Sequence, residues 1–144
     1  MAFSMALTQA IYVFLYIRDK EILGRELLPA ASIAVAVGLP KPSVVKILRS
    51  LHQAGIVTTG TGVNGGARLA PGAEDRNLAD LFLAIEGQTP IFRTDHEIPA
   101  LGAQPALVRA KVGGLLEDLD GQFRRLLGQV KLAEILPPPS RTRR

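Results

Sequence analysis

The sequence KPSVVKILRSLHQAGIVTTGTGVNGGARLA spans residues 41–70 and holds two different patterns of apolar residues. Its first part, residues 41–53, repeats apolar residues at intervals of three and four, which predicts a helix with one buried face: Val44, Ile47, Leu48 and Leu51. Its second part has a β-branched run at residues 56–59, then a glycine-rich stretch with an Asn-Gly pair, then a second short run at residues 67–70. We therefore expect a helix that is followed directly by a β-hairpin.

A second short helix is predicted immediately before this one. Residues 27–37 are apolar and rich in alanine, and we expect Pro29 in the first turn of the helix, where its missing N–H costs nothing. Gly38 can adopt the left-handed conformation that ends a helix. Two short helices joined through a glycine turn, with a hairpin after the second, are typical of a winged helix-turn-helix.

Two more helices are predicted around this motif. Residues 4–17 repeat apolar residues with helical spacing after a capping Ser4, and we expect the charged residues 18–20 to end that helix. Residues 78–86 follow Asn77, which belongs to a residue type that caps helices. The pattern therefore predicts one winged helix-turn-helix DNA-binding domain over residues 1–87.

A long helix is predicted beyond a connecting loop at residues 88–104. From Pro105 onward, apolar residues recur at every third or fourth position, as in the seam between two helices: Val108, Val112, Leu115, Leu119, Phe123, Leu126 and Val130. A helix with a single apolar stripe is not stable alone, so we expect residues 105–136 to be a dimerisation region that packs outside the winged domain. Its glycines, at positions 113, 114, 121 and 128, are expected to let two backbones approach closely.

The predicted fold class is mostly α with a small β-wing, a winged helix-turn-helix plus a long C-terminal dimerisation helix. The chain has 144 residues and a formal net charge of +4, which suits a polyanionic partner without requiring one. It has no cysteine, which excludes disulfides, thiol nucleophiles and cysteine-ligated iron–sulfur clusters. Residues 6–17, the densest apolar stretch, are too few for a membrane span of roughly 20 residues. Residues 137–144 are predicted to be a basic disordered tail.

The helix at residues 41–53 carries the first set of candidate DNA contacts: Lys41, Ser43, Lys46 and Arg49. A helix N-terminus with basic side chains along one face can lie in a major groove, where phosphate contacts position it and base edges give specificity. We expect Arg49 to reach a guanine edge and Lys46 to contact a phosphate. The alternative is an ordinary solvated basic face, which the hairpin that follows makes less favoured.

The hairpin carries the second set of candidate DNA contacts: Asn64, Gly65, Gly66 and Arg68. Glycine lets backbone N–H groups approach a phosphate or the minor groove, and Arg68 adds positive charge. The alternative is a plain hairpin turn without a DNA contact.

Other residues with reactive or ligating side chains are few. Asp95-His96-Glu97 is the one compact cluster of metal-type ligands, and a solvated loop explains it better than a metal site, which would need ligands from elsewhere. Whether His96 and residues 91–104 form a sensor site stays open. His52 is expected to be half-buried or to cap its helix. The sequence contains no nucleophile elbow, P-loop or cofactor fingerprint, so we expect no enzyme, no catalytic residue, no cofactor and no metal.

Three segments resemble the Rrf2 (Rrf-two) family of bacterial winged-helix transcription regulators. They are residues 48–57 (LRSLHQAGIV), residues 62–70 (GVNGGARLA), and residues 77–87, with NLAD at the start and AIEG at the end. The resemblance covers residues 5–87 well and the long helix by pattern only. Family members that hold an iron–sulfur cluster have three cysteines between the fourth helix and the long one. Residues 91–104 contain none, so the resemblance implies a variant without the cluster.

We therefore expect a cytoplasmic homodimer that binds double-stranded DNA in a sequence-specific way and represses transcription, with a small-molecule effector left open. Two-fold symmetry predicts half-sites roughly 34 to 36 Å apart. The alternative is a winged-helix protein-interaction or scaffold module with little DNA affinity. The position of the charge separates the two: DNA binding predicts Lys41, Lys46, Arg49 and Arg68 on one face, whereas a scaffold predicts acidic residues that neutralise this face.

Overall fold

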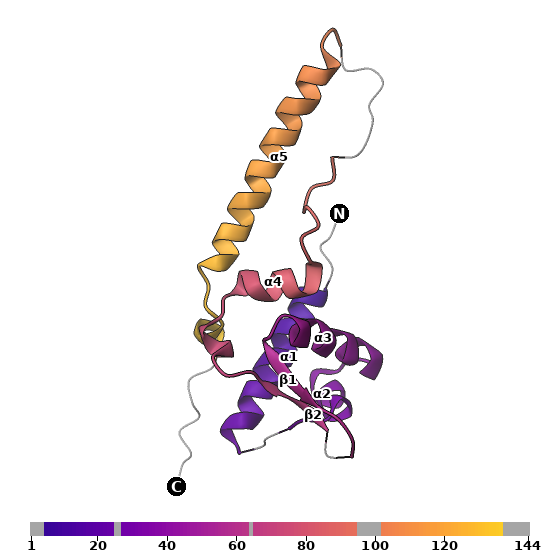
Figure 1. Cartoon of the computed structure of the whole chain (residues 1–144), viewed down its shortest axis with the longest axis vertical. Helices are drawn as coiled ribbons and strands as arrows, with labels where there is room; N and C mark the ends of the chain where they lie inside the picture. Colours follow the sequence, from indigo (N-terminus) through magenta and orange to yellow (C-terminus); the bar gives the residue numbers. More distant parts are fainter. Residues whose placement is uncertain (1–4, 25–26, 64, 95–101, 137–144) are drawn as a thin grey trace.

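The computed structural model describes residues 5–24, 27–63, 65–94 and 102–136. Ser4, Asn64, the cluster at residues 95–97 and the tail at residues 137–144 lie outside the described residues, and so do the structures expected of them. Figure 1 shows a compact part made of the described residues from 5 to 87, which we call the winged unit, and one long helix that stands away from it. The elements are α1 (Ala6–Ile22), α2 (Ala30–Val37), α3 (Lys41–Gln53), β1 (Val57–Gly60), β2 (Gly66–Leu69), η1 (Ala73–Asp75), α4 (Leu78–Glu86), α5 (Pro105–Gly128) and η2 (Leu132–Ile135). The predicted fold class, mostly α with a small β-wing, is confirmed.

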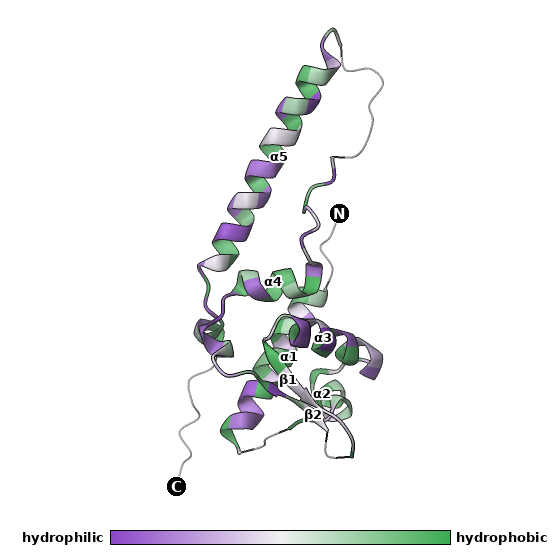
Figure 2. Cartoon of the chain, viewed as in Figure 1, coloured by the Kyte–Doolittle hydropathy of each residue, from purple (hydrophilic) through white to green (hydrophobic). Residues whose placement is uncertain are grey.

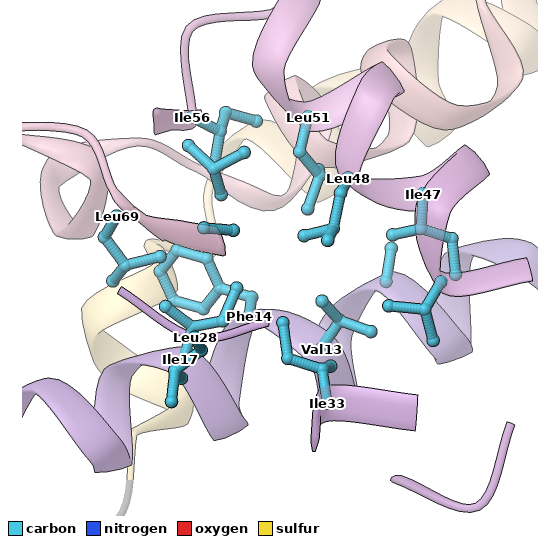
Figure 3. Packing of buried hydrophobic residues seen from close by; sticks show 14 of the residues in the cluster. Val13, Phe14, Ile17, Leu28, Ile33, Ile47, Leu48, Leu51, Ile56 and Leu69 are labelled. Atoms are coloured by element: carbon cyan, nitrogen blue, oxygen red, sulfur yellow. The ribbon is translucent and has the colours of Figure 1, made fainter. Parts of the chain in front are cut away.

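The hydrophobic core lies where α1, α2, α3 and the wing meet. The face of α3 that was predicted from its spacing is buried at all four positions. Against it pack wholly buried side chains from the other elements, among them Val13, Phe14, Ile17, Leu28, Ile33 and Ile56 (Figure 3). Full burial of a large apolar side chain contributes about 1.5–3 kcal/mol. Because the described residues include no buried polar or charged residue, α3 is fixed by apolar packing alone on its inner side.

The segment before α2 differs from its prediction. The helix begins at Ala30, and Pro29 is its N-cap in an extended conformation rather than a residue of the first turn. The reason is that Leu28 is paired with the wing: its N–H donates to the Ala67 carbonyl at 3.0 Å, and the Ala67 N–H donates back at 2.8 Å. Gly38 ends α2 with a φ of 70°, as predicted.

The wing is a two-stranded antiparallel hairpin. Val57 pairs with Leu69 and Gly60 with Gly66. Ala67 and Leu69 are buried on the side of the core, so the side chain of Arg68, between them in an alternating strand, lies on the solvent side.

The first helix continues past the point where its charged residues were expected to end it. α1 reaches Ile22. Residues outside the helix stabilise the added turn: the Leu69 N–H donates to Glu21 Oε1 at 2.6 Å, and Arg18 forms an ion pair with Glu74. The expectation failed because Arg18 and Glu21 have partners that are distant in the sequence.

Residues 105–136 are not one element. α5 ends at Gly128, and η2 returns to the winged unit, where Leu132 is wholly buried in the core. The Leu132 N–H donates to the Arg76 carbonyl at 2.8 Å. The expectation that this whole region packs outside the winged domain is therefore wrong for its last part.

In the part of the chain that the structure describes, α5 contacts the winged unit through its C-terminal part, which packs on α4. Phe123 packs edge-to-face on Phe82 of α4 with 5.8 Å between the ring centroids. A β-carbon on Gly128 would be 3.9 Å from that of Ala79, whereas at Gly113 and Gly114 no atom outside their own helix backbone lies within 4 Å. α5 contains no buried residue.

Within the described residues, no single helix is long and apolar enough to cross a membrane, and the pair α2–α3, bent by 113°, passes that test only when taken together.

Candidate nucleic-acid interface

The outer face of α3 is a strip of exposed, mostly polar side chains. Lys46, Arg49 and Gln53 are all exposed there, on the side opposite the buried face. The helix contains no acidic residue, and in the described part of the chain Lys41, Lys46 and Arg49 form no ion pair. This strip therefore presents unneutralised positive charge to solvent.

A cleft separates α3 from the wing. Its volume is about 440 Å³, and it lies between Lys41, Arg49 and His52 on one side and Thr59 and Gly60 on the other. Two basic side chains at the edge of a concave surface, next to exposed backbone, form a surface that can follow a phosphate backbone. Lys41 and Arg49 therefore both line this cleft, whereas Lys46, on the same helix, does not.

Ser43 lies away from this cleft. Two positions along a helix rotate a side chain by about 200°, so Ser43 is on the opposite flank of α3 from Lys41. It is half-buried, and it does not line the cleft. Ser43 is three positions before Lys46 and about 60° from it around the helix, so it lies beside Lys46 and away from the cleft.

The paired glycines of the wing have a reason in the fold itself. A β-carbon on Gly66 would be 2.5 Å from the Leu28 carbonyl carbon, because the chain before α2 runs directly against β2. A β-carbon on Gly65 would be 2.8 Å from the Gly60 carbonyl oxygen. Such distances exclude any side chain at either position without a shift of the backbone. The two glycines also line the cleft, but close packing alone explains them.

Arg68 lies apart from the basic residues of α3. It lines a different cavity of about 640 Å³, together with Glu21, Glu74 and Asp75. The four cations expected on one face are therefore divided: Lys41, Lys46 and Arg49 belong to the α3 side, and Arg68 belongs to a cavity with acidic walls.

Two residues near the site have roles that the sequence did not predict: His52 was expected to be half-buried or to cap its helix, and Arg76 was given no role. His52 is exposed and lines the cleft, with its Nδ1 3.3 Å from the Val57 carbonyl oxygen. The sequence signal for this position was that His52 is three residues after Arg49, which places both side chains on neighbouring positions of the same helix face. Arg76 donates to the Ala54 carbonyl at 3.2 Å and to Asp80 at 3.0 Å, so it holds the end of α3 against α4. No local sequence pattern predicts that Arg76 links α3 to α4, because Arg76 lies in a loop.

The arrangement defines the class of protein as a winged helix-turn-helix. The model of the Rrf2 family, described as an iron-dependent transcriptional regulator, matches residues 3–138. A curated HTH-type transcriptional regulator of Lactococcus lactis subsp. lactis (strain IL1403), YffB, is 32% identical over 141 residues, 94% of this chain and 86% of the relative. The chain therefore belongs to the Rrf2 family of transcriptional regulators.

Solved structures agree on the fold. A protein from Lactobacillus plantarum, described as a transcriptional regulator, has a TM-score of 0.73 at 23% identity, covering 90% of this chain and 85% of its own. CymR of Staphylococcus aureus has a TM-score of 0.64 at 20% identity, covering 94% of this chain and 100% of its own.

The iron in the family's description does not fit a cysteine-ligated site in this chain. The sequence has no cysteine, so no thiolate can hold a cluster. Among the described residues, no three His, Asp or Glu side chains are grouped so that they could hold a metal ion.

Proposed function

We propose that this protein is a sequence-specific DNA-binding repressor that acts as a homodimer, without an iron–sulfur cluster, in the cytoplasm. The observation that carries the proposal is the acid-free outer face of α3 next to the cleft at the wing. A helix of this kind is positioned in a major groove by phosphate contacts and reads base edges from there.

The charge distribution favours DNA over the scaffold alternative. A scaffold face was expected to have its basic residues neutralised by acidic ones. Acidic residues do accompany Arg68, but none accompanies Lys41, Lys46 or Arg49 in the described residues. Lys41, Lys46 and Arg49 therefore stay as proposed DNA contacts, and Arg49 is the one proposed to read a base.

The long helix supports the proposed dimer, and occupancy of a promoter by that dimer supports the proposed repression. α5 leaves apolar side chains exposed along its length, which a second copy can cover. A dimer with two recognition helices occupies two half-sites, and occupancy of a promoter excludes polymerase without any activating contact. A small-molecule effector stays a prediction that no observation tests.

The experiment is a selection of genomic fragments that the purified full chain retains, followed by gel shifts at several salt concentrations. The proposal expects a two-fold symmetric site that is bound at least about a thousandfold more tightly than unrelated duplex. In a reporter with that site across the promoter, the protein should lower expression. Equal affinity for all duplexes would contradict sequence specificity, and raised expression would contradict repression.

A further inference from the structure

The outer face of α3 carries an exposed apolar side chain among its charged and polar ones. Val45 is 37% exposed, and it lines the cleft together with Lys41 and Arg49. Figure 2 shows hydrophobic as well as hydrophilic residues along α3. Valine is among the weaker helix formers, because its branched side chain loses freedom at χ1 in a helix. Helix propensity therefore does not account for a valine at this exposed position.

Val45 lies between the two lysines of the proposed DNA-binding face. At 100° per residue, it is about 40° from Lys41 and about 100° from Lys46 around the helix. Pro42, which is also exposed, lies three positions before Val45 and about 60° from it, again between the two lysines. The first two turns of α3 therefore present a pair of apolar side chains with a lysine on each side.

This arrangement matches the two kinds of surface that a major groove offers. The lysines can contact phosphates at the borders of the groove, and the residues between them face the base edges. An apolar side chain against the polar atoms of a base removes their water and gives no hydrogen bond in return. The 5-methyl group of thymine is the one methyl group on the major-groove edges of the unmodified base pairs. Val45 therefore fits a thymine better than any other base.

We infer that Val45, with Pro42 beside it, contacts the 5-methyl group of a thymine, and that each half-site has a T·A base pair at this position. The inference rests on the proposed function and names a base that it reads. Val45 precedes Arg49 by about one helical turn, or about 6 Å along the axis, and base pairs follow one another every 3.4 Å or so. The thymine is thus expected about two base pairs from the guanine proposed for Arg49.

The other side chains of this face support thymine over the remaining bases. α3 contains no Asp or Glu that could accept a hydrogen bond from cytosine N4, and the side chains of Val45 and Pro42 can neither donate nor accept one. Valine has one strongly preferred rotamer in a helix, so its two methyl groups are already in place before DNA binds. The contact therefore requires little ordering of the side chain.

Replacement of thymine by deoxyuridine isolates this contact, because it removes the methyl group and keeps every base-pairing group. Each thymine of the selected site is replaced in turn, at symmetric positions in both half-sites, and gel shifts with the full chain give the dissociation constant. Burial of one methyl group corresponds to about a fourfold change in affinity, so replacement at the position read by Val45 should weaken binding about sixteenfold over two half-sites.

The variant Val45→Ala connects that position to the side chain. It should bind the thymine and deoxyuridine duplexes with affinities within about threefold of each other, because the side chain that contacts the methyl group is shortened. Alanine is the better helix former and the position is exposed, so the variant should fold, which circular dichroism checks. Val35→Ala, the same change at an 85% exposed position of α2, is the matched control and should keep the full ratio.

Cytosine methylation gives a second, independent measurement. A C·G pair in place of the T·A pair should weaken binding. The base 5-methylcytosine in that pair should then restore about fourfold of affinity per half-site, because its methyl group has the same place in the major groove as that of thymine. Val45→Ala should not distinguish cytosine from 5-methylcytosine.

Each contrary result has a separate meaning. A selected site that contains no thymine, or that binds equally well with deoxyuridine at every thymine, overturns the inference, while sequence-specific binding and with it the proposed function survive. A ratio that persists in Val45→Ala assigns the methyl contact to another residue and also overturns the inference. Equal affinity for all duplexes contradicts the proposed function and the inference together.

Discussion

Gly66 lies against the backbone of Leu28 so closely that a β-carbon at position 66 would be 2.5 Å from both the carbonyl carbon and the carbonyl oxygen of Leu28. The two main-chain hydrogen bonds between Leu28 and Ala67 keep these segments together. The wing is thereby joined to the chain that leads into α2. This contact gives the Gly-Gly pair a role in folding that does not depend on DNA.

The first prediction concerns this contact. Gly66→Ala should lower the free energy of unfolding by about 1–3 kcal/mol, because the added methyl group forces the two backbones apart. Urea denaturation measures the loss. Gly114→Ala is the matched control, and it should raise stability by up to about 1 kcal/mol, because that glycine is in a helix with open space around it. A Gly66→Ala protein of normal stability that has lost DNA affinity would assign the glycine to DNA instead.

The second prediction separates Lys46 from Arg49. Lys46→Gln should weaken binding to all duplexes alike and reduce the salt slope by about one, as expected for a phosphate contact. Arg49→Ala should also relax the preference at one base pair by about 1–3 kcal/mol. Gel shifts over a salt series with single-base variants of the site distinguish the two results. Lys131→Gln removes one charge elsewhere and is the control. An equal loss for every sequence with Arg49→Ala contradicts base reading.

The third prediction follows from the position of Arg68. Because this side chain shares its cavity with Glu21, Glu74 and Asp75, Arg68→Gln should change DNA affinity less than Lys46→Gln does under the same conditions. The same gel shifts provide the comparison. A larger effect for Arg68 would mean that the wing reaches the duplex on the side of this cavity.

Residues that contact neighbours in the sequence were predictable, and residues with distant partners were not. The buried face of α3, its basic outer face and the capping of α4 by Asn77 all follow from spacings of three and four. The extension of α1 depends on a bond from the Leu69 N–H to Glu21, and the extended Leu28 depends on Ala67. Neither bond has a local signal, because its two ends are far apart in the chain.

The same distinction applies to the candidate site. Lys41 and Arg49 meet at the cleft because both positions follow the period of one helix. Ser43 is rotated by about 200° from Lys41, so it lies beside Lys46 and does not line the cleft. The separation of Arg68 could not be predicted, since its cavity is formed by residues from α1 and η1. Leu132 lies beyond Val130, the last residue of the predicted stripe, but inside the region 105–136 that was expected to dimerise; its burial in the core depends on the turn after α5.

The fourth prediction concerns pH. Burial alone would raise the pKa of Asp120, but the hydrogen bond from the Ile91 N–H and the pairing with Arg124 at 2.6 Å hold this pKa below its usual value. A lowered pKa in the folded state means that the stabilisation is complete above the unfolded pKa of about 3.9 and is lost as pH falls through the folded pKa. Asp120→Asn should therefore reduce stability by about 1 kcal/mol at pH 7, a difference that disappears towards pH 3.

Urea denaturation between pH 7 and pH 3 checks this dependence. Asp19→Asn is the control, because Asp19 is exposed and its ion pair with the adjacent Lys20 is at the surface, where such pairs contribute little. A difference for Asp120→Asn that stays constant down to pH 3 would mean that the charge of this carboxylate does not matter.

In the described residues, α5 is attached near its C-terminal end, so a small rotation at that end moves its other end by a larger distance. From Asp120, which together with Phe123 forms the joint, α5 extends about 23 Å to its first residue, Pro105. A tilt of about eight degrees at that joint displaces the far end by about 3 Å, close to the 3.4 Å step between successive base pairs. In the proposed homodimer, small repacking at the joint thus changes the spacing of the two proposed recognition helices along the double helix, without any change inside the winged unit.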